Sequence, residues 1–155
     1  MQKIRPWLWF KDRAEEAARF YVSVFPNSSL THLSYYGEEG PGPAGQVMVA
    51  TFVLDGVQFM ALNGGSEAEY SSAFYVDCET QEEIDHLWDR LSEGGEPGVC
   101  GWLKDRFGVS WNIVPSAFGE MMSDDDDEKT GRVMQAMLAM TKMDIAALRR
   151  AYDGN

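Results

Sequence analysis

The side chains that most often bind metal ions or act as nucleophiles are few in this chain and far apart in sequence. There are two cysteines, Cys78 and Cys100, and two histidines, His32 and His86. A structural zinc site needs four ligands, and a disulfide framework needs more than one pair of cysteines. The sequence predicts neither, and Cys100 is interpreted as a small buried thiol in preference to a reactive one.

An acidic run at Asp124–Asp127, followed by Glu128, has the composition of a calcium site but not its spacing. A calcium loop alternates its oxygen ligands and turns at a glycine, and D-D-D-D-E does neither. Negative side chains at the start of a helix interact favourably with the helix dipole. We therefore expect this run to lie at a helix start and not around an ion.

Two arginines have the chemistry to hold an anion. Arg106 follows Asp105 in a predicted hairpin turn, where the two residues either pair with each other or point toward a bound anion. Arg5, near the start of the chain, can hold a carboxylate or phosphate through a forked contact of two hydrogen bonds. The sequence leaves both alternatives for Asp105 and Arg106 open, so their role depends on the elements that position them.

The chain contains two segments with the same plan, a strand followed by an amphipathic helix. The predicted pairs are Ile4–Phe10 with Asp12–Phe25, and Ala73–Cys78 with Thr80–Leu91. Each helix starts with the spacing of a capping box, in which two side chains satisfy free amides: Asp12 with Glu15, and Thr80 with Glu83. Two such units side by side can curl their sheets around one cavity.

Further strands and helices complete the prediction. Apolar alternation and turn signals predict strands at Ser29–Tyr36, Gln46–Leu54, Val57–Asn63, Pro97–Cys100, Gly101–Asp105 and Ser110–Val114, with a tight hairpin at Asp55-Gly56. Beyond Pro115, Ser123 with Asp126 is predicted to cap a helix through about Met140, and Asp144 a last one through about Tyr152. The prediction is one α+β domain, residues 1–155, with modules at about 3–64 and 70–115 and a helical tail at 116–155.

Composition narrows the class of partner. Of 155 residues, 45% are apolar and 12% aromatic, which is ample for a packed interior, and the formal net charge is −12. That charge repels phosphate backbones and anionic membranes, so neither nucleic acid nor membrane is expected as a partner. Met1–Phe10 does not resemble a signal peptide, and no apolar run approaches the ~20 residues of a bilayer span. A cytoplasmic location is the expectation.

Three runs of the sequence carry a family resemblance. They are W-L-W-F-K-D-R-A-E-E-A-A-R-F-Y-V-S-V-F-P at Trp7–Pro26, A-L-N-G-G at Ala61–Gly65, and C-G-W-L-K-D-R-F-G-V-S-W-N-I-V-P at Cys100–Pro115. Together they resemble the PhnB-like proteins, many of them labelled 3-demethylubiquinone-9 3-methyltransferase domains. These belong to the vicinal oxygen chelate (glyoxalase/bleomycin resistance/dioxygenase) superfamily. The resemblance implies paired βαβββ modules that form a cupped mixed sheet, and commonly a homodimer.

The resemblance also locates the positions at which metal enzymes of the superfamily hold a divalent ion. By alignment these positions fall on Arg5, Ala61, Ser71 and Asn112. A cation needs lone-pair donors, with a carboxylate or imidazole at most positions. Arg5 repels a cation and Ala61 offers no lone pair, while Ser71 and Asn112 supply only weak neutral oxygens. The resemblance therefore predicts no metal here, and no other cofactor is expected.

Strand parity within the same alignment predicts which side chains line the cup, because residues two apart on a strand share a face. The positions predicted to face the helices are Leu8, Phe10, Met60, Leu62, Phe74, Val76, Trp111 and Ile113. The predicted ligand-binding positions are Arg5, Trp7, Trp9, Phe59, Asn63, Ser71, Tyr75, Ser110 and Asn112. Aromatic walls with a few polar groups are typical of a small-molecule pocket. The alternative is that these residues fill the cup or meet a partner subunit.

We therefore expect a metal-independent small-molecule-binding protein, with an acidic or carbonyl-bearing aromatic ligand as the hypothesis. The alternatives are an enzyme of the superfamily, such as a lyase or isomerase using Tyr75 and Asn112, and a structural or interaction module. Methyl transfer is not expected. Methyl donors usually bind at a glycine-rich turn between strand and helix, and the helix starts at Asp12 and Thr80 lack glycine.

Overall fold

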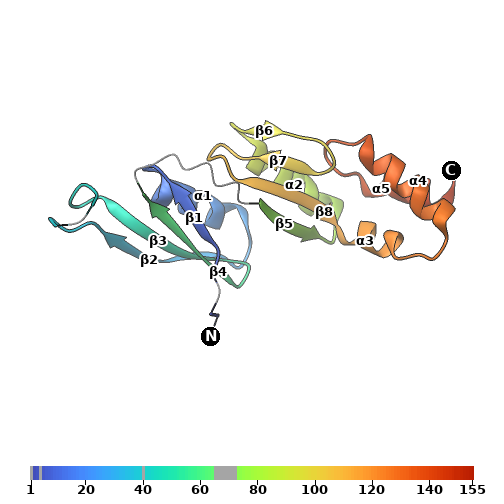
Figure 1. The fold of residues 1–155 in the computed structure, drawn as a ribbon. Helices are drawn as coiled ribbons and strands as arrows, with labels where there is room; N and C mark the ends of the chain where they lie inside the picture. Colours follow the sequence, from blue (N-terminus) through green and yellow to red (C-terminus); the bar gives the residue numbers. More distant parts are fainter. Residues whose placement is uncertain (1, 4, 40, 65–72) are drawn as a thin grey trace. The chain divides into compact units, whose positions relative to one another are not determined.

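The computed structural model of the chain describes residues 2–3, 5–39, 41–64 and 73–155 (Figure 1). The fold is α+β, and the chain divides into two compact units, Met1–Tyr70 and Ser71–Asn155. Each unit contains one four-stranded sheet with the strand order of a βαβββ module. The predicted fold class is confirmed. Among the described residues, no helix is both long enough and apolar enough to span a bilayer.

The first unit is built from five elements. They are β1 (Trp7–Phe10), α1 (Ala14–Val24), β2 (Ser29–Tyr35), β3 (Val47–Leu54) and β4 (Val57–Asn63). The sheet has the order β1-β4-β3-β2, in which β1 runs parallel to β4 and the other pairs are antiparallel. Asp55 and Gly56 both have positive φ, 45° and 80°, which is the backbone of the tight hairpin turn that the sequence predicts.

Helix α1 packs one face of this sheet with aromatic and small side chains. Tyr21 and Phe52 are fully buried with ring centroids 6.3 Å apart, and Phe52 lies 5.6 Å from the ring of Phe59. Ala14, Ala17 and Ala18 are also buried, so the helix approaches the strands closely. Burial of these apolar surfaces is the main source of stability in this unit.

The predicted capping box at the start of α1 is wrong. The helix begins at Ala14, its N-cap residue Arg13 makes no side-chain capping bond, and Glu15 pairs with Arg19 one turn along. Instead, the Asn63 side-chain oxygen on β4 accepts from the Ala14 amide at 2.8 Å. A buried acceptor beneath the helix start satisfies this amide without solvent competition, so a partner distant in sequence replaces the local one.

The second unit repeats the plan and adds three helices. Its elements are β5 (Ala73–Cys78), α2 (Gln81–Ser92), β6 (Glu96–Pro97), β7 (Trp102–Lys104), β8 (Ser110–Pro115), α3 (Ser116–Met122), α4 (Asp127–Leu138) and α5 (Ile145–Asp153). The sheet has the order β5-β8-β7-β6, again with its first pair parallel. Here the predicted capping box is confirmed: Thr80 accepts from the Glu83 amide, and the Glu83 carboxylate accepts from the Glu79 amide.

The core of the second unit lies between α2 and its sheet. Helix α2 buries Ile84, Leu87, Trp88 and Leu91, which is the stripe that the sequence predicts. From the sheet, Trp111 and Ile113 are buried on the same side, as predicted. The Trp111 ring lies 5.3 Å from the ring of Phe74 on the neighbouring strand.

Of the two caps predicted in the C-terminal segment, Asp144 is confirmed and Ser123 is wrong, because Ser123 lies at the end of α3 and donates to the Glu120 carbonyl. Asp126 caps α4 and Asp144 caps α5, through bonds from the amides of Glu128 and Ala147 respectively. The sequence did not separate α3 from the rest of the tail. Helices α4 and α5 lie side by side (Figure 1), and Arg132 donates to the carbonyls of Ala151 and Tyr152 at the end of α5. A cation at a helix C-terminus is favourable with the dipole.

Candidate functional site

Each sheet has one face against its own helix and another that we call the open face. In the first unit, residues that are partners in the register share a face, and this defines two rows across the open face. The rows are Trp7, Met60, Thr51 and His32, and Trp9, Leu62, Val49 and Ser34. Trp7 is 43% exposed and Trp9 44%, which is high for the largest apolar side chain. The prediction that both tryptophans lie on the open face is confirmed.

For two predicted ligand-binding residues of the first unit, Phe59 and Asn63, the predicted side of the sheet is wrong. Phe10 pairs with Asn63 and Leu8 with Ala61 in the parallel register, so Phe59, Ala61 and Asn63 face α1. Phe59 is buried against Phe52, and Asn63 is 3% exposed, with its amide donating to the Val47 carbonyl. Both side chains are therefore part of the packed core of the first unit. Met60 and Leu62, which the sequence predicts to face the helix, lie on the open face instead.

His32 is a residue of the open face that the sequence reasoning missed. It lies in β2, within the strand predicted at Ser29–Tyr36, opposite Thr51 and after a register shift between Leu30 and His32. A bulge of this kind changes which face a side chain points to. No local sequence signal reveals the bulge, so strand parity alone could not place this imidazole.

The open face of the second unit carries the predicted polar positions. One row contains Tyr75, Asn112 and Trp102, and the next contains Ala73, Ser110 and Lys104. Tyr75 is 62% exposed, and partial desolvation and then nearby Asp77 raise the pKa of its phenol, so the hydroxyl keeps its proton at neutral pH. Trp102 was missed, although the burial of its neighbour Leu103 follows the same alternation. The predicted Ser71 lies outside the described residues.

Asn112 has a fixed side-chain orientation. Its amide nitrogen donates to the Cys100 carbonyl at 3.1 Å. A carbonyl only accepts, so the nitrogen of the amide faces Cys100 and its oxygen is directed elsewhere as an acceptor. Asn112 therefore presents an acceptor, while the protonated Tyr75 phenol beside it in the register can donate or accept.

The residues at the four metal positions do not fit a divalent ion. Ala61 carries only a methyl group and is fully buried toward α1, and the exposed Arg5 brings a positive charge. Shifting by one residue on β4 gives Met60 or Leu62, which offer no hard oxygen or nitrogen donor. Among the described residues, no group of three or more His, Cys, Asp or Glu side chains is arranged to hold a metal. These positions therefore do not offer a suitable set of ligands for a divalent ion.

Asp105 resolves the alternatives for the second hairpin. Its carboxylate is 3% exposed and accepts from the amides of Phe107 and Val109 and from the indole N–H of Trp111, at 2.8, 3.0 and 2.8 Å. Arg106 lies 3.9 Å from Glu93. The carboxylate is thus a structural acceptor within the turn and does not point toward an anion.

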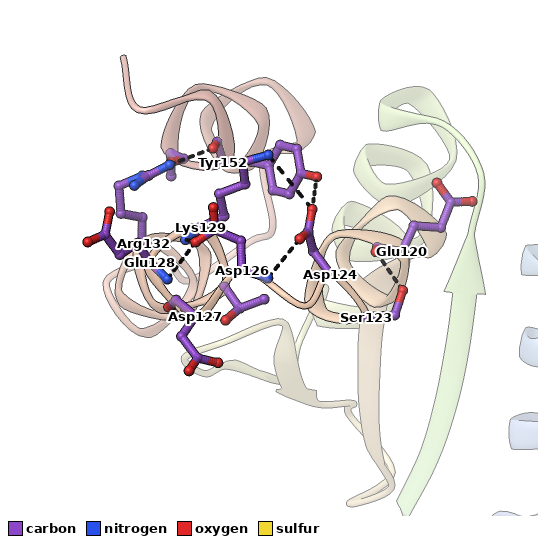
Figure 2. Close-up of polar contacts among 11 residues, drawn as sticks. Glu120, Ser123, Asp124, Asp126, Asp127, Glu128, Lys129, Arg132 and Tyr152 are labelled. Carbon is purple, nitrogen blue, oxygen red and sulfur yellow. Dashed lines mark hydrogen bonds and ion pairs between the residues drawn. The ribbon is translucent and has the colours of Figure 1, made fainter.

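The acidic run lies at a helix start, as predicted (Figure 2). Asp126 accepts from the amides of Glu128 and Lys129. Asp124 accepts from the Asp126 amide and from the Tyr152 hydroxyl, which lowers the pKa of Asp124 and raises that of Tyr152. These oxygens are occupied by protein donors, so the run ties α4 to α5.

A cleft of about 280 Å³ lies beside this network. It is lined from α3 and α5 by Ala117, Glu120, Met121, Arg149, Tyr152 and Asp153. None of the predicted ligand-binding residues lines it. The cleft therefore contributes nothing to the open faces described above.

The two cysteines differ in environment. Cys78 is fully buried, and burial raises the pKa of its thiol to about 12, which makes it a poor nucleophile at neutral pH. Cys100 is half-buried, so the expectation of a buried thiol is only partly met. Its backbone has φ of +58°, an uncommon value for a residue with a side chain. The backbone of Cys100 makes two contacts: its carbonyl accepts from the Asn112 side chain, and its amide donates to the C-terminal segment.

Comparison with known proteins decides the family. Residues 2–114, more than half of the chain, match the model of the 3-demethylubiquinone-9 3-methyltransferase family. The chain belongs to this family. A solved structure of the PhnB protein from Bacillus cereus is 38% identical, covers 74% of this chain and 100% of its own, and has a TM-score of 0.66. This confirms the PhnB-like resemblance that the three sequence runs carry.

Two solved structures with lower sequence identity to this chain share its fold. Protein PA1353 from Pseudomonas aeruginosa is 23% identical with a TM-score of 0.61, and the match covers 74% of this chain and 98% of that one. The fosfomycin resistance protein FosX from Listeria monocytogenes, in complex with Mn(II) and 1S,2S-dihydroxypropylphosphonic acid, is 16% identical with a TM-score of 0.53, covering 73% and 92%. No curated protein matches the chain. The superfamily fold is therefore established for this PhnB-like chain.

Proposed function

We propose that this PhnB-like protein binds a small organic molecule on the open face of a sheet and does so without a metal ion. The observation that carries the proposal is the exposure of Trp7, Trp9, Tyr75 and Trp102 beside polar side chains, while the opposite faces are filled by the helices. Exposed aromatic rings that a ligand covers gain free energy from burial and from stacking, about 0.5–1.5 kcal/mol per ring pair beyond the area term.

The polar groups of each face favour a class of ligand for that face. On the first unit, Arg5 is exposed ahead of β1 and suits a carboxylate through a forked contact. On the second unit, Tyr75 supplies a protonated hydroxyl and Asn112 an acceptor, and Ser110 adds a hydroxyl in the next row. The first face therefore favours an aromatic carboxylate, and the second favours a carbonyl compound that also has a hydrogen-bond donor.

The proposal extends to assembly and location. We propose a homodimer in the cytoplasm, on the strength of the PhnB-like resemblance and of the expectations from the sequence. The net charge of −12 supports a partner that is neither a nucleic acid nor an anionic membrane surface.

The methyltransferase name of the family is not the function that we propose. Transfer from a nucleoside methyl donor needs free amides at a glycine-rich helix start. In this chain the Ala14 amide of α1 bonds to Asn63 and the Glu83 amide of α2 bonds to Thr80, and neither strand-to-helix turn contains glycine. The second candidate is an enzyme of the lyase or isomerase type, favoured by Tyr75 and Asn112, which are direct neighbours in the register.

A screen of aromatic carboxylates and ketones by tryptophan fluorescence, with a chelator present, tests the proposal. With 4-hydroxybenzoate as the first probe, we expect saturable quenching, and about tenfold weaker affinity in Arg5→Ala because a charged two-bond contact is lost. Trp9→Ala is expected to abolish most of the quenching. Lys11→Ala, which removes an exposed positive charge from the opposite end of β1, serves as the control.

Two results decide this test. Equal affinity of Arg5→Ala and Lys11→Ala for the screened ligands would remove Arg5 from the site. Ligand binding that disappears on adding chelator and returns with a divalent ion would contradict metal independence. Chemical conversion of a bound ligand in the presence of chelator would favour the enzyme over the binding protein.

A further inference from the structure

We infer that the C-terminal helices set the orientation of Asn112 on the open face of the second sheet, through the backbone of the Cys100–Gly101 turn. The functional part of this inference rests on the proposed function, in which Asn112 contacts the ligand. Helices α3, α4 and α5 lie beyond residues 2–114, the part that matches the family.

The turn at Cys100 and Gly101 packs directly on β8. Both residues have positive φ, +58° and +80°. A Cβ atom at Gly101 would lie 2.6 Å from the Ile113 carbonyl oxygen, so only glycine allows this approach. The Ile113 amide also donates to the Gly101 carbonyl at 2.8 Å. The turn is thus held against the strand that carries Asn112.

On the strand side, the turn holds the Asn112 side chain. The Cys100 carbonyl accepts from the Asn112 amide nitrogen. On its other side, the same turn holds the segment after α4: the Cys100 amide donates to the Met140 carbonyl at 2.9 Å, and the Gly101 amide to the Thr141 carbonyl at 2.8 Å. One short piece of backbone therefore connects the C-terminal segment to Asn112.

The C-terminal segment is itself docked on the first turn of α2. The Gln81 side chain donates to the Met143 carbonyl at 3.0 Å and accepts from the Ile145 amide at 2.9 Å. Lys142 lies 2.9 Å from Asp85, and the Met143 side chain is buried. These contacts fix the position of the carbonyls that bind the Cys100–Gly101 turn.

The arrangement has a consequence for ligand choice. With the segment docked, Asn112 turns its oxygen away from Cys100 and accepts a hydrogen bond. With the segment released, the turn loses its two amide bonds to Met140 and Thr141, so the Cys100 carbonyl is held less firmly and the Asn112 amide rotates more readily to present its nitrogen. Docking therefore selects a ligand with a donor at this point, and release lowers the selectivity for a donor over an acceptor.

Hydrogen exchange of the Asn112 side-chain amide, followed by ¹H–¹⁵N NMR on the full chain, tests the connection without any ligand. Asn112→Asp assigns the signal. In Gln81→Ala/Lys142→Ala, and separately in Met143→Asp, we expect exchange of the Asn112 side-chain protons to accelerate at least about tenfold. The Gly101 backbone amide, which bonds to the Thr141 carbonyl, reports undocking in the same spectra.

Each outcome decides the inference. The control Gln135→Ala/Arg150→Ala also removes one glutamine and one positive charge, but from exposed positions of α4 and α5. It should leave hydrogen exchange of the Asn112 side-chain amide unchanged. Loss of protection at the Gly101 amide with full protection at Asn112 would overturn the connection. Retained protection at the Gly101 amide in both variants would show that the named contacts do not dock the segment and would overturn the inference as well. Because no ligand is involved, neither result bears on the proposed function.

Discussion

Asp105→Ala is expected to lower the free energy of unfolding by about 4 kcal/mol. The carboxylate accepts three hydrogen bonds in a buried turn, two from backbone amides and one from the Trp111 indole. Alanine leaves these donors without their acceptor in a region that water does not easily reach. Urea unfolding followed by tryptophan fluorescence measures the loss, with an unchanged denaturant slope as the sign that only stability has moved.

Two companion variants sharpen this result. Asp105→Asn keeps one oxygen but replaces the other with a donor that faces existing donors, so we expect an intermediate loss of about 2 kcal/mol. Asp125→Ala removes an exposed carboxylate from the acidic run and should stay within about 0.5 kcal/mol of the parent. If Asp105→Ala were as mild as Asp125→Ala, the carboxylate would have no structural role in the turn.

Asn63→Ala should cost about 3 kcal/mol, because the Asn63 side chain joins two elements of the first unit. It accepts from the Ala14 amide at the start of α1 and donates to the Val47 carbonyl on β3. Alanine leaves one amide and one carbonyl unsatisfied in the core. The loss is measured by the same urea unfolding, and the far-ultraviolet circular dichroism of the folded variant tests whether the first turn of α1 frays.

Asp12→Ala is the matched control for Asn63. Asp12 occupies the position that the sequence predicts as the helix cap, and it makes no capping bond to α1. We expect a change below about 0.5 kcal/mol. A large loss in Asp12→Ala together with a small loss in Asn63→Ala would restore the local capping box and contradict the long-range cap.

Much of the fold was predictable because its signals are local. Runs rich in apolar residues between turn signals predicted Val57–Asn63 and Ala73–Cys78 with their observed bounds, and the Asp55-Gly56 turn needed only its backbone preference. The helix caps at Thr80 and Asp144 are likewise set by residues within one turn. Such features do not depend on which distant strand or helix packs nearby.

The facing of β4 was not predictable from its own sequence. Both parities of this strand are apolar, with Phe59 and Ala61 on one side and Met60 and Leu62 on the other, so alternation does not tell which side meets the helix. The parallel register with β1 decides it. On β8, by contrast, Ser110 and Asn112 alternate with buried Trp111, and the predicted facing is confirmed.

The long-range features of the site escaped prediction for a similar reason. The cap from Asn63 joins residues 49 positions apart, and a bulge on β2 sets the facing of His32. The bond from Asn112 to Cys100 depends on a turn whose positive φ at a cysteine has no sequence signal. The sequence therefore predicted which types of residue lie on the open faces better than it predicted the contacts that these residues make.

Native mass spectrometry of the full chain purified directly from cell extract tests the central claim, metal-free binding of a small molecule, most directly. The account predicts a bound mass that belongs to an organic compound, retained after treatment with a chelator and lost in Trp9→Ala. A bound mass equal to one divalent metal ion per chain, removed by the chelator and retained in Trp9→Ala, would contradict it.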